Sequence, residues 1–325
     1  MAVSRRVFMG GFAAATFAAP ARVRAAGEPL AIGFVPANSV YWDLVVAIEK
    51  DFFRDAGFEP EPFVMESSPH SIEQARAGVY QIAASQPEPF VQAVLGGSHM
   101  LAAIAAPMSR ADWCLNVQDA FSHLSQLKGK IIGVSALRSS EVWLTNLLLE
   151  KAGLNKADVT YHVVGTSPQK LAALKDGSIA AAVLFQPSAA LAYEQGFPVL
   201  ARYAALRPYP AIVYVVRRDW AARNENGKRA AAAIRRAHKW LWDPANQNEA
   251  LTILMKTTKQ DSPILAAVYF QYFIGGRIYS PTGELELAGL TNALNDTAGD
   301  GQVPADPAPS SLRFVLEREL GGCWF

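Results

Sequence analysis

The most constraining feature of this 325-residue sequence is a pattern of elements that occurs twice. In the first copy a short helix ends at Gly78, an apolar strand follows, and Gln86-Pro87 opens the next helix. In the second copy Gly177 and Gln186-Pro187 stand at the same places. Proline suits the first turn of a helix, because its φ angle is already helical and its missing N–H would have no partner there. The repeat predicts two similar α/β lobes whose facing loops form a cleft.

Residues 30–62 show how each predicted lobe begins. An apolar run is followed by a loop in which Asn38 or Ser39 caps a helix, and Gly57 ends that helix. A second apolar run comes next, so the order is strand, loop, helix, strand, which is the first βαβ unit of a parallel sheet. One long doubly wound sheet without a cleft would begin in the same way and is the alternative.

The first 26 residues read as an export signal rather than as part of the fold. Arg5-Arg6 precedes a weakly apolar run, which is typical of a twin-arginine signal cleaved between about Ala25 and Gly27. A chance arginine pair before an alanine-rich start is the alternative. Without the four arginines of this segment, the formal charge of +1 becomes −3. A mildly acidic chain argues against nucleic acid or an anionic membrane surface as a partner.

The sequence has two cysteines, Cys114 and Cys323. An oxidising compartment would permit a disulfide bond between them. Two unpaired cysteines, with Cys114 in the core, are the alternative. Their spacing does not decide between the two.

Three segments of the chain share their pattern with one known family. They are the opening strand, loop and helix with Phe52-Phe53, the segment Leu127–Val134 (LKGKIIGV), and the helix, glycine, strand and proline of Leu171–Pro187. On these segments the chain resembles the solute-binding proteins of ABC importers that bind sulfonates, taurine, nitrate or thiamine pyrimidines. One departure is Ala180, where the family commonly has Asp-Ala entering the strand, and Gln81 stands at the equivalent place in the first lobe.

The resemblance implies the periplasmic binding protein-like fold II. In that fold each of two lobes is a mostly parallel sheet flanked by helices, and two crossover strands, here near 113–117 and 211–216, join them. Lobe I would then comprise residues 27–115 and 216–325, and lobe II residues 116–215. The resemblance also implies a periplasmic monomer without a cofactor or a metal ion, which passes a small solute to a membrane ABC permease.

Candidate ligand-binding residues lie in the loops that follow the predicted strands, because open α/β sheets bind ligands there. Most are hydrogen-bonding or aromatic. Hydroxyl groups and helix N-termini favour anionic oxygen atoms, so a sulfonate or a carboxylate, aromatic or not, is the expected ligand, and a pyrimidine-like heterocycle also fits. The candidates are Asn38, Tyr41, Trp42, Ser67, Ser85 and Gln86 in the first lobe and Arg138, Ser139, Ser140 and Gln186 in the second.

Several residues near these loops have a structural interpretation as well. Arg138 could bind an anion through two parallel hydrogen bonds or remain solvated in its loop. Trp42 could stack on a flat ligand or pack against the sheet. Glu141, in the first turn of a helix, suits a capping role better than contact with an anion. His238 lies on an apolar helix face and is predicted to be a packed core residue.

The sequence favours a binding protein over an enzyme. It contains no nucleophile elbow, phosphate loop, dinucleotide-binding glycine motif or histidine pair at metal-ligand spacing. The same fold includes a sulfinate hydrolase with a cysteine nucleophile and a pyrimidine synthase with a cysteine-rich motif, and neither signature is present. Cys114 lies in a predicted crossover strand without an adjacent base. An enzyme or a ligand sensor on this fold is the alternative.

Overall fold

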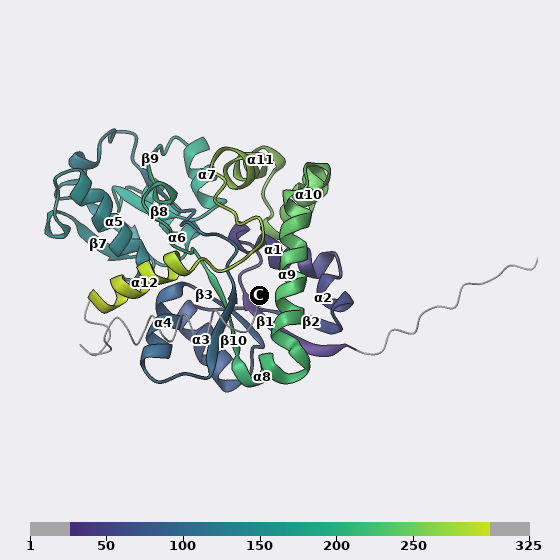
Figure 1. Cartoon of the computed structure of the whole chain (residues 1–325). Helices are drawn as coiled ribbons and strands as arrows, with labels where there is room; N and C mark the ends of the chain where they lie inside the picture. The colour runs from purple at the N-terminus through teal and green to yellow at the C-terminus, as the bar shows by residue number, and fades with distance from the viewer. Residues whose placement is uncertain (1–26, 300–325) are drawn as a thin grey trace, which may run out of the picture.

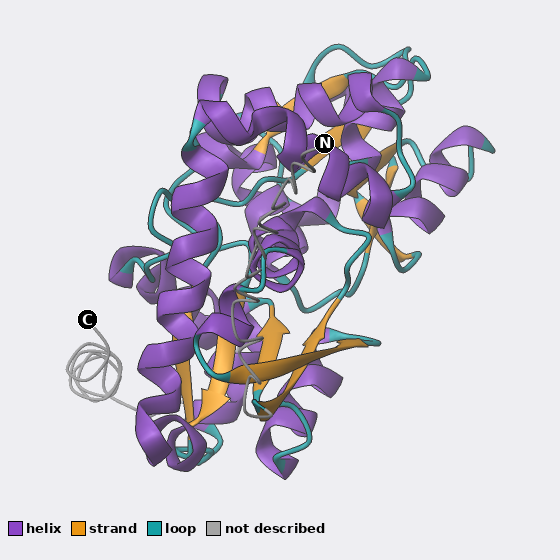
Figure 2. Cartoon of the chain, turned by 90° about the vertical axis from the view of Figure 1, so that its right-hand side faces the viewer, coloured by secondary structure: helices purple, strands orange, loops and turns teal. Residues whose placement is uncertain are grey.

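Two five-stranded sheets form the centres of two lobes in the computed structural model, which describes residues 27–299 (Figure 1). The first sheet consists of β1 (Glu28–Phe34), β2 (Phe58–Val64), β3 (Ile82–Ser85), β4 (Leu101–Ala105) and β10 (Val213–Arg217), and the second of β5 (Cys114–Val117), β6 (Ile131–Val134), β7 (Thr160–Val163), β8 (Ala181–Leu184) and β9 (Val199–Arg202). Figure 2 shows the strands in two separate groups. The predicted two-lobed α/β fold is confirmed, and a single undivided sheet is wrong.

The two sheets have the same topology. The strand orders are β2-β1-β3-β10-β4 and β7-β6-β8-β5-β9. In each sheet the first three strands are parallel, and the fourth is antiparallel to both of its neighbours. The repeat in the sequence is therefore a repeat of sheet architecture, and in both sheets the antiparallel strand comes from outside the repeated unit.

The chain crosses between the sheets twice, once before β5 and once before β10. The predicted boundary at 115/116 falls inside β5, and the one at 215/216 falls inside β10. Hydrogen bonding places β5 whole in the second sheet and β10 whole in the first. We therefore propose that the lobes divide within residues 106–113 and 203–212, which we call the first and second crossing segments.

Helices cover the outer faces of both sheets. The α-helices are α1 (Trp42–Glu49), α2 (Phe52–Asp55), α3 (Ser68–Ala77), α4 (Pro87–Leu95), α5 (Ser140–Lys151), α6 (Ser167–Lys175), α7 (Ser188–Glu194), α8 (Arg218–Ala222), α9 (Asn226–Trp242), α10 (Gln247–Thr258), α11 (Ser262–Tyr269) and α12 (Leu287–Gly299). The 3-10 helices are η1 (Ser39–Tyr41), η2 (Leu124–Leu127), η3 (Lys156–Asp158), η4 (Tyr203–Ala205), η5 (Arg223–Glu225) and η6 (Pro244–Asn246), and η7 (Phe270–Gly275) is a π-helix. No helix within residues 27–299 is long and apolar enough to cross a membrane.

One helix joins the two lobes. Figure 1 shows α12 between α4 of the first lobe and α5 of the second, and it contacts both helices. Asn292 Nδ2 donates a hydrogen bond to the carbonyl oxygen of Pro208 at 2.8 Å, and Asp296 forms an ion pair with Arg207. The helix is thus attached to the second crossing segment as well as to both lobes.

A hydrogen-bonded polar network lies inside the first lobe, around His238. Its Nε2 lies 2.9 Å from Asp43 Oδ2, and its Nδ1 lies 2.6 Å from the carbonyl oxygen of Ser280. The hydroxyl of Tyr214 donates to Asp43 Oδ1 at 2.6 Å. Since the Ser280 carbonyl can only accept, Nδ1 carries a proton. The prediction that His238 is a packed core residue is confirmed, because its side chain is fully buried.

The predictions for the chain ends lie outside the described residues. These are the export signal in residues 1–26, its cleavage site, and any bond made by Cys323. Cys114 is buried and free.

Candidate ligand-binding site

Side chains from both lobes meet around Asp112, in the first crossing segment. Its Oδ2 accepts a hydrogen bond from the hydroxyl of Tyr272 at 2.7 Å. That hydroxyl also lies 3.0 Å from Ser39 Oγ, in the loop after β1. The backbone N–H of Gln186, in the loop after β8, lies against the same carboxylate. All four side chains are buried, so one carboxylate connects the loops at the strand ends of both lobes.

A second buried carboxylate, Glu88, lies between the lobes in the first turn of α4. Its Oε1 accepts a hydrogen bond at 2.8 Å from the hydroxyl of Tyr209, which belongs to the second crossing segment. Ser140, the first residue of α5 in the second lobe, lies beside the carboxylate. A helix N-terminus favours negative charge. Glu88 therefore lies at the α5 N-terminus, where the sequence had led us to expect an anionic ligand.

These residues define what we call the interlobe junction, and both of its carboxylates are in a poor environment for charge. Burial raises the pKa of Asp112 from 3.8 to about 6, against the opposing effect of the Tyr272 and Gln186 hydrogen bonds. Burial also raises the pKa of Glu88, and Ser140 and Tyr209 oppose that shift. Within residues 27–299, Asp112 Oδ1, Glu88 Oε2 and Ser140 Oγ form no complete hydrogen bond, although Ser140 lies close enough to Glu88 to act on its charge. The junction consists of two clusters, Ser39, Asp112, Gln186 and Tyr272 around one carboxylate, and Glu88, Ser140 and Tyr209 around the other.

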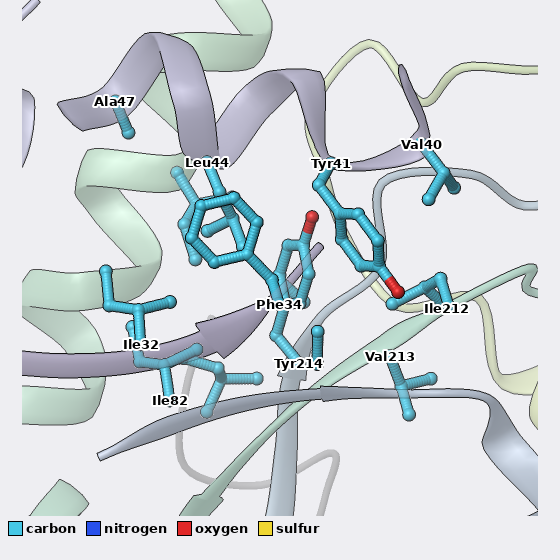
Figure 3. Packing of buried hydrophobic residues seen from close by; sticks show 14 of the residues in the cluster. Ile32, Phe34, Val40, Tyr41, Leu44, Ala47, Ile82, Ile212, Val213 and Tyr214 are labelled. Atoms are coloured by element: carbon cyan, nitrogen blue, oxygen red, sulfur yellow. The ribbon is translucent and has the colours of Figure 1, made fainter. Parts of the chain in front are cut away.

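Two predicted aromatic residues lie in different places. Tyr41 has its ring buried beside Phe34, and Figure 3 shows its hydroxyl directed toward Ile212 of the second crossing segment. Burial, and after it the charge of Asp112, raises the pKa of Tyr41, so this residue lies near the junction. Trp42 lies instead in the core of the first lobe.

The surroundings of Trp42 account for that position. Its Nε1 donates to the carbonyl oxygen of Ala250 at 3.2 Å, and the indole packs edge-on against Tyr269 and Phe273. The side chain is 0% exposed, so neither face of the indole is free to stack on a solute. Trp42 therefore packs in the core of the first lobe and is not available to stack on a ligand.

The predicted polar residues of the first lobe mostly cap their own loops. Asn38 Oδ1 accepts from the backbone N–H of Val40 at 3.1 Å, and the exposed Ser67 accepts from that of His70 at 3.3 Å. Ser85 Oγ donates to the carbonyl oxygen of Gln86 at 2.7 Å. The backbone N–H of the half-buried Gln86 donates to Ser68 Oγ at 3.0 Å. These four residues shape the loop ends beside the junction.

The predicted residues of the second lobe lie on two loops. Arg138 is exposed, whereas Ser139 is buried and donates to the carbonyl oxygen of Ala136 at 2.8 Å. The side chain of Gln186 donates to Gln271 Oε1 at 2.9 Å and accepts from the backbone N–H of Ala190 at 3.1 Å. Of these residues, Ser140 and Gln186 reach the interlobe junction.

Sequence reasoning missed Glu88, Asp112, Tyr209 and Tyr272. Glu88 had a usable signal, because it follows Gln86-Pro87 where the second copy of the repeat has Ser188. Asp112 follows Ser109-Arg110-Ala111 and stands directly before the predicted crossover strand. The two tyrosines come from parts of the chain that no repeat connects to the loops, so their positions depend on tertiary packing.

Cys114 lies close to the junction, but its thiol is not activated. Burial raises the pKa of this thiol to about 11, and the nearby Arg202 only partly opposes that effect. The thiolate is the nucleophilic form of cysteine, and very little of it exists near neutral pH at such a pKa. This environment agrees with the prediction that Cys114 has no covalent role.

Other features of the described residues lie apart from the junction. A surface groove on the second lobe is lined by Leu147, Glu150, Lys151, Leu206 and Arg207. None of the predicted ligand-binding residues lines it. Residues 27–299 contain no group of three or more His, Cys, Asp or Glu side chains that could hold a metal ion.

Comparisons with known proteins agree with this architecture. The sequence profile of the NMT1-like family matches residues 24–255. No curated protein sequence matches the chain. The periplasmic aliphatic sulphonate binding protein SsuA from Escherichia coli is similar in structure, with a TM-score of 0.71 and 19% identity over 90% of this chain and 99% of that chain.

Two further structures share the fold. The periplasmic nitrate-binding protein NrtA from Synechocystis PCC 6803 has a TM-score of 0.72 and 15% identity, over 90% of this chain and 88% of that chain. A mutant of DszB in complex with biphenyl-2-sulfinic acid has a TM-score of 0.63 and 16% identity, over 90% of this chain and 99% of that chain. At these identities the similarity shows a common fold.

Proposed function

The chain belongs to the NMT1-like family, and from this we propose that it is the solute-binding component of an ABC importer. It captures a small organic solute at the interlobe junction and delivers it to a membrane permease. The observation that carries the proposal is the network around Asp112, in which Tyr272 and the backbone of Gln186 bond the carboxylate, and Ser39 of the first lobe bonds Tyr272. Similar structures that are described as sulphonate-binding and nitrate-binding proteins support it.

The mechanism is closure of the two lobes around the solute. The lobes are joined by two crossing segments, and both segments supply junction residues, Asp112 from the first and Tyr209 from the second. A solute that contacts both lobes binds the closed arrangement more tightly than the open one, and therefore shifts the population toward it. The permease then distinguishes loaded from empty protein by the relative position of the lobes.

Location and partners form part of the same proposal. The paired arginines Arg5-Arg6 support export by the twin-arginine route, and hence a periplasmic protein. A monomer with one solute site and a permease as its protein partner fits the family. The fold of DszB is shared as well, but the raised pKa of the Cys114 thiol gives no support to a cysteine-based reaction.

The chemical class of the solute is the finer part of the proposal. The sequence favoured an anion, a sulfonate or a carboxylate, with a pyrimidine-like heterocycle as the alternative. The N-terminus of α5 supports an anion, because unpaired N–H groups there attract negative charge. Glu88 opposes it, because its carboxylate already lies beside Ser140 at that N-terminus.

Isothermal titration calorimetry on the exported form, residues 27–325, tests the proposal. We expect one small organic solute to bind per chain, and chromatography should recover that solute unchanged after long incubation. Small-angle scattering should show a smaller radius of gyration with the solute than without it. Chemical conversion of the bound solute would contradict the proposal and favour the enzyme alternative.

A further inference from the structure

Gln271, in the π-helix η7, connects the two lobes through its side chain. Its Oε1 accepts a hydrogen bond from Gln186 Nε2 at 2.9 Å and another from Arg202 Nη1 at 3.0 Å. Gln186 follows β8 and Arg202 ends β9, so both donors belong to the second lobe. Figure 1 shows α11, which η7 continues, beside α7 of the second lobe, and these two helices are in contact. We call Gln186, Arg202 and Gln271 the latch.

The donors and acceptors of the latch are matched. An arginine side chain can only donate, so Gln271 must present its oxygen atom to Arg202. Gln186 must then present its NH2 group to the same oxygen, which leaves the Gln186 oxygen for the backbone N–H of Ala190 at 3.1 Å. Because one donor is charged, its bond to Gln271 is stronger than a bond between neutral groups.

The two residues after Gln271 contact other parts of the molecule. Tyr272 bonds Asp112 in the first crossing segment, and Phe273 packs edge-on against Trp42 in the core of the first lobe. Tyr272 and Phe273 are buried, whereas Gln271 is half-buried. Separation of the lobes therefore breaks polar bonds that water can replace, and it leaves the apolar contacts of η7 in place.

The hydrogen bonding of η7 is unusual at this point. In a π-helix the bonds run from residue i to residue i+5, and the backbone N–H of Gly276 donates to the carbonyl oxygen of Gln271 at 3.1 Å in this way. Such turns are rare and often occur at functional sites. Here three consecutive side chains reach the second lobe, the first crossing segment and the core of the first lobe.

We propose that the latch favours the closed arrangement of the lobes before any solute is bound. The inference rests on the proposed function and deepens it, because it assigns control of closure to Gln271 and its two partners. Breaking the latch lowers the fraction of closed chains. The apparent affinity for a solute that binds the closed arrangement falls with that fraction.

Distances between two spin labels test the latch in solute-free protein. Glu73→Cys and Ala172→Cys place the labels at the exposed sixth residue of α3 and of α6, one in each lobe. Cys323→Ser removes a competing thiol, and the buried Cys114 is retained. In Gln271→Ala we expect a second distance, whose population relative to the first rises at least about tenfold, since a hydrogen bond to a charged group is lost.

Further variants distinguish the latch from the loss of any side chain at this position. Gln271→Glu keeps an acceptor oxygen and adds a negative charge opposite Arg202, so the closed distance should be at least as populated as in the natural protein. Arg202→Met removes the charged donor and should open the lobes as Gln271→Ala does. Gln195→Ala changes an exposed glutamine of the second lobe and should leave the distance distribution unchanged.

The outcomes separate the latch from the proposed function. If Gln271→Ala folds with the natural distance distribution, or if Arg202→Met does so where Gln271→Ala does not fold, the inference is overturned and the proposed function stands. Opening of Gln271→Glu to the same extent as Gln271→Ala also overturns it, because the acceptor oxygen would then have no effect. Failure of the natural protein to bind any small solute in calorimetry counts against the proposed function and leaves the label distances as they are.

Discussion

At the scale of single residues, Asp112 couples the stability of the protein to pH. Burial raises the pKa of its carboxyl to about 6 in the folded chain, from 3.8 in the absence of burial. Between these values the folded state holds a proton that the unfolded state has lost. This contribution to stability is therefore fully present below pH 3.8 and is lost as the pH rises through 6. Burial of Glu88 acts in the same direction.

We therefore predict that Asp112→Asn alters the pH dependence of unfolding. In urea unfolding experiments without a ligand, the difference between natural protein and variant should change by about 2 kcal/mol between pH 4 and pH 7.5, with the natural protein losing more stability. Asp119→Asn, at an exposed position, should reproduce the natural slope. Parallel pH profiles for Asp112→Asn and the natural protein would contradict the assignment.

Lys170 and Glu141 give a second prediction at this scale. Lys170 Nζ lies 3.0 Å from Glu141 Oε2, both side chains are 0% exposed, and burial lowers the pKa of the lysine while Glu141 opposes that shift. Lys170→Met leaves the carboxylate buried without a cation, so we expect a loss of about 3–5 kcal/mol of unfolding free energy in urea. Lys175→Met, on the exposed side of the same helix, should change it by less than about 0.5 kcal/mol.

A double variant shows whether the loss of stability in Lys170→Met comes from the unpaired carboxylate of Glu141 or from the lost packing of the lysine. Adding Glu141→Leu to Lys170→Met removes the stranded charge, so stability should recover in part despite the lost Ser135 hydrogen bonds. A double variant less stable than Lys170→Met alone would show that the contacts of Glu141 with Ser135 outweigh its unpaired charge.

At the scale of strands and helices, a glycine in the second strand of each sheet lets a side chain lie across the sheet. A Cβ added at Gly33 in β1 would be 2.3 Å from the ring of Tyr80, and one at Gly133 in β6 would be 2.6 Å from Ile179 Cδ1. Each glycine pairs with a central alanine of the neighbouring parallel strand, Ala83 or Ala182. The two lobes thus use the same packing device at matching positions.

The two glycines differ in what would have to move. We predict that Gly33→Ala lowers the unfolding free energy by about 1–3 kcal/mol, because the buried ring of Tyr80 must turn away. Gly133→Ala should cost less, since the end of an isoleucine side chain can rotate. Thermal unfolding of both variants gives the comparison, and equal losses would contradict this account.

Local patterns in the sequence were enough to predict where many elements end. Gly57, Gly78, Gly153 and Gly177 all have positive φ angles, as expected for glycines that end helices or begin turns. By contrast, α11 is followed directly by the π-helix η7, a change of hydrogen bonding that no periodicity in the sequence reveals.

The candidate site was harder to predict, because its side chains find their partners across the fold. Trp42 meets Tyr269 and Phe273 from more than 200 positions away in the chain, which turns a loop-flanking aromatic residue into a core residue. Tyr272 reaches Asp112 over a sequence separation of 160. The loops could be located from sequence, whereas the orientation of each side chain depends on these distant contacts.

At the scale of the whole molecule, α12 connects the lobes, and its Gly289 lies very close to Pro210 of the second crossing segment. A Cβ added at Gly289 would lie 2.9 Å from Pro210 Cδ in the second crossing segment. Alanine normally stabilises a helix relative to glycine by about 1 kcal/mol. Here we predict that Gly289→Ala destabilises the protein and speeds hydrogen exchange in α12, because the helix must move away from the segment.

A control on the same helix shows whether the effect belongs to the contact. Ala288 is the exposed neighbour of Gly289, so Ala288→Gly should cost only the ordinary helix preference of about 1 kcal/mol and leave exchange in α4 and α5 unchanged. Gly289→Ala should raise exchange in those two helices as well, since both contact α12. A stabilised Gly289→Ala variant would show that α12 tolerates the added methyl group.

The order of the strands has a consequence for the newly made chain on the ribosome. The second sheet is complete once Arg202 has emerged, whereas the first still lacks β10, which must enter between β3 and β4. The lobe whose synthesis starts first is therefore the one that finishes later. Until β10 arrives, the facing edges of β3 and β4 remain unpaired, and such edges invite association with other nascent chains. Because the second lobe forms early from one continuous stretch of chain, fewer segments remain unpaired during this interval.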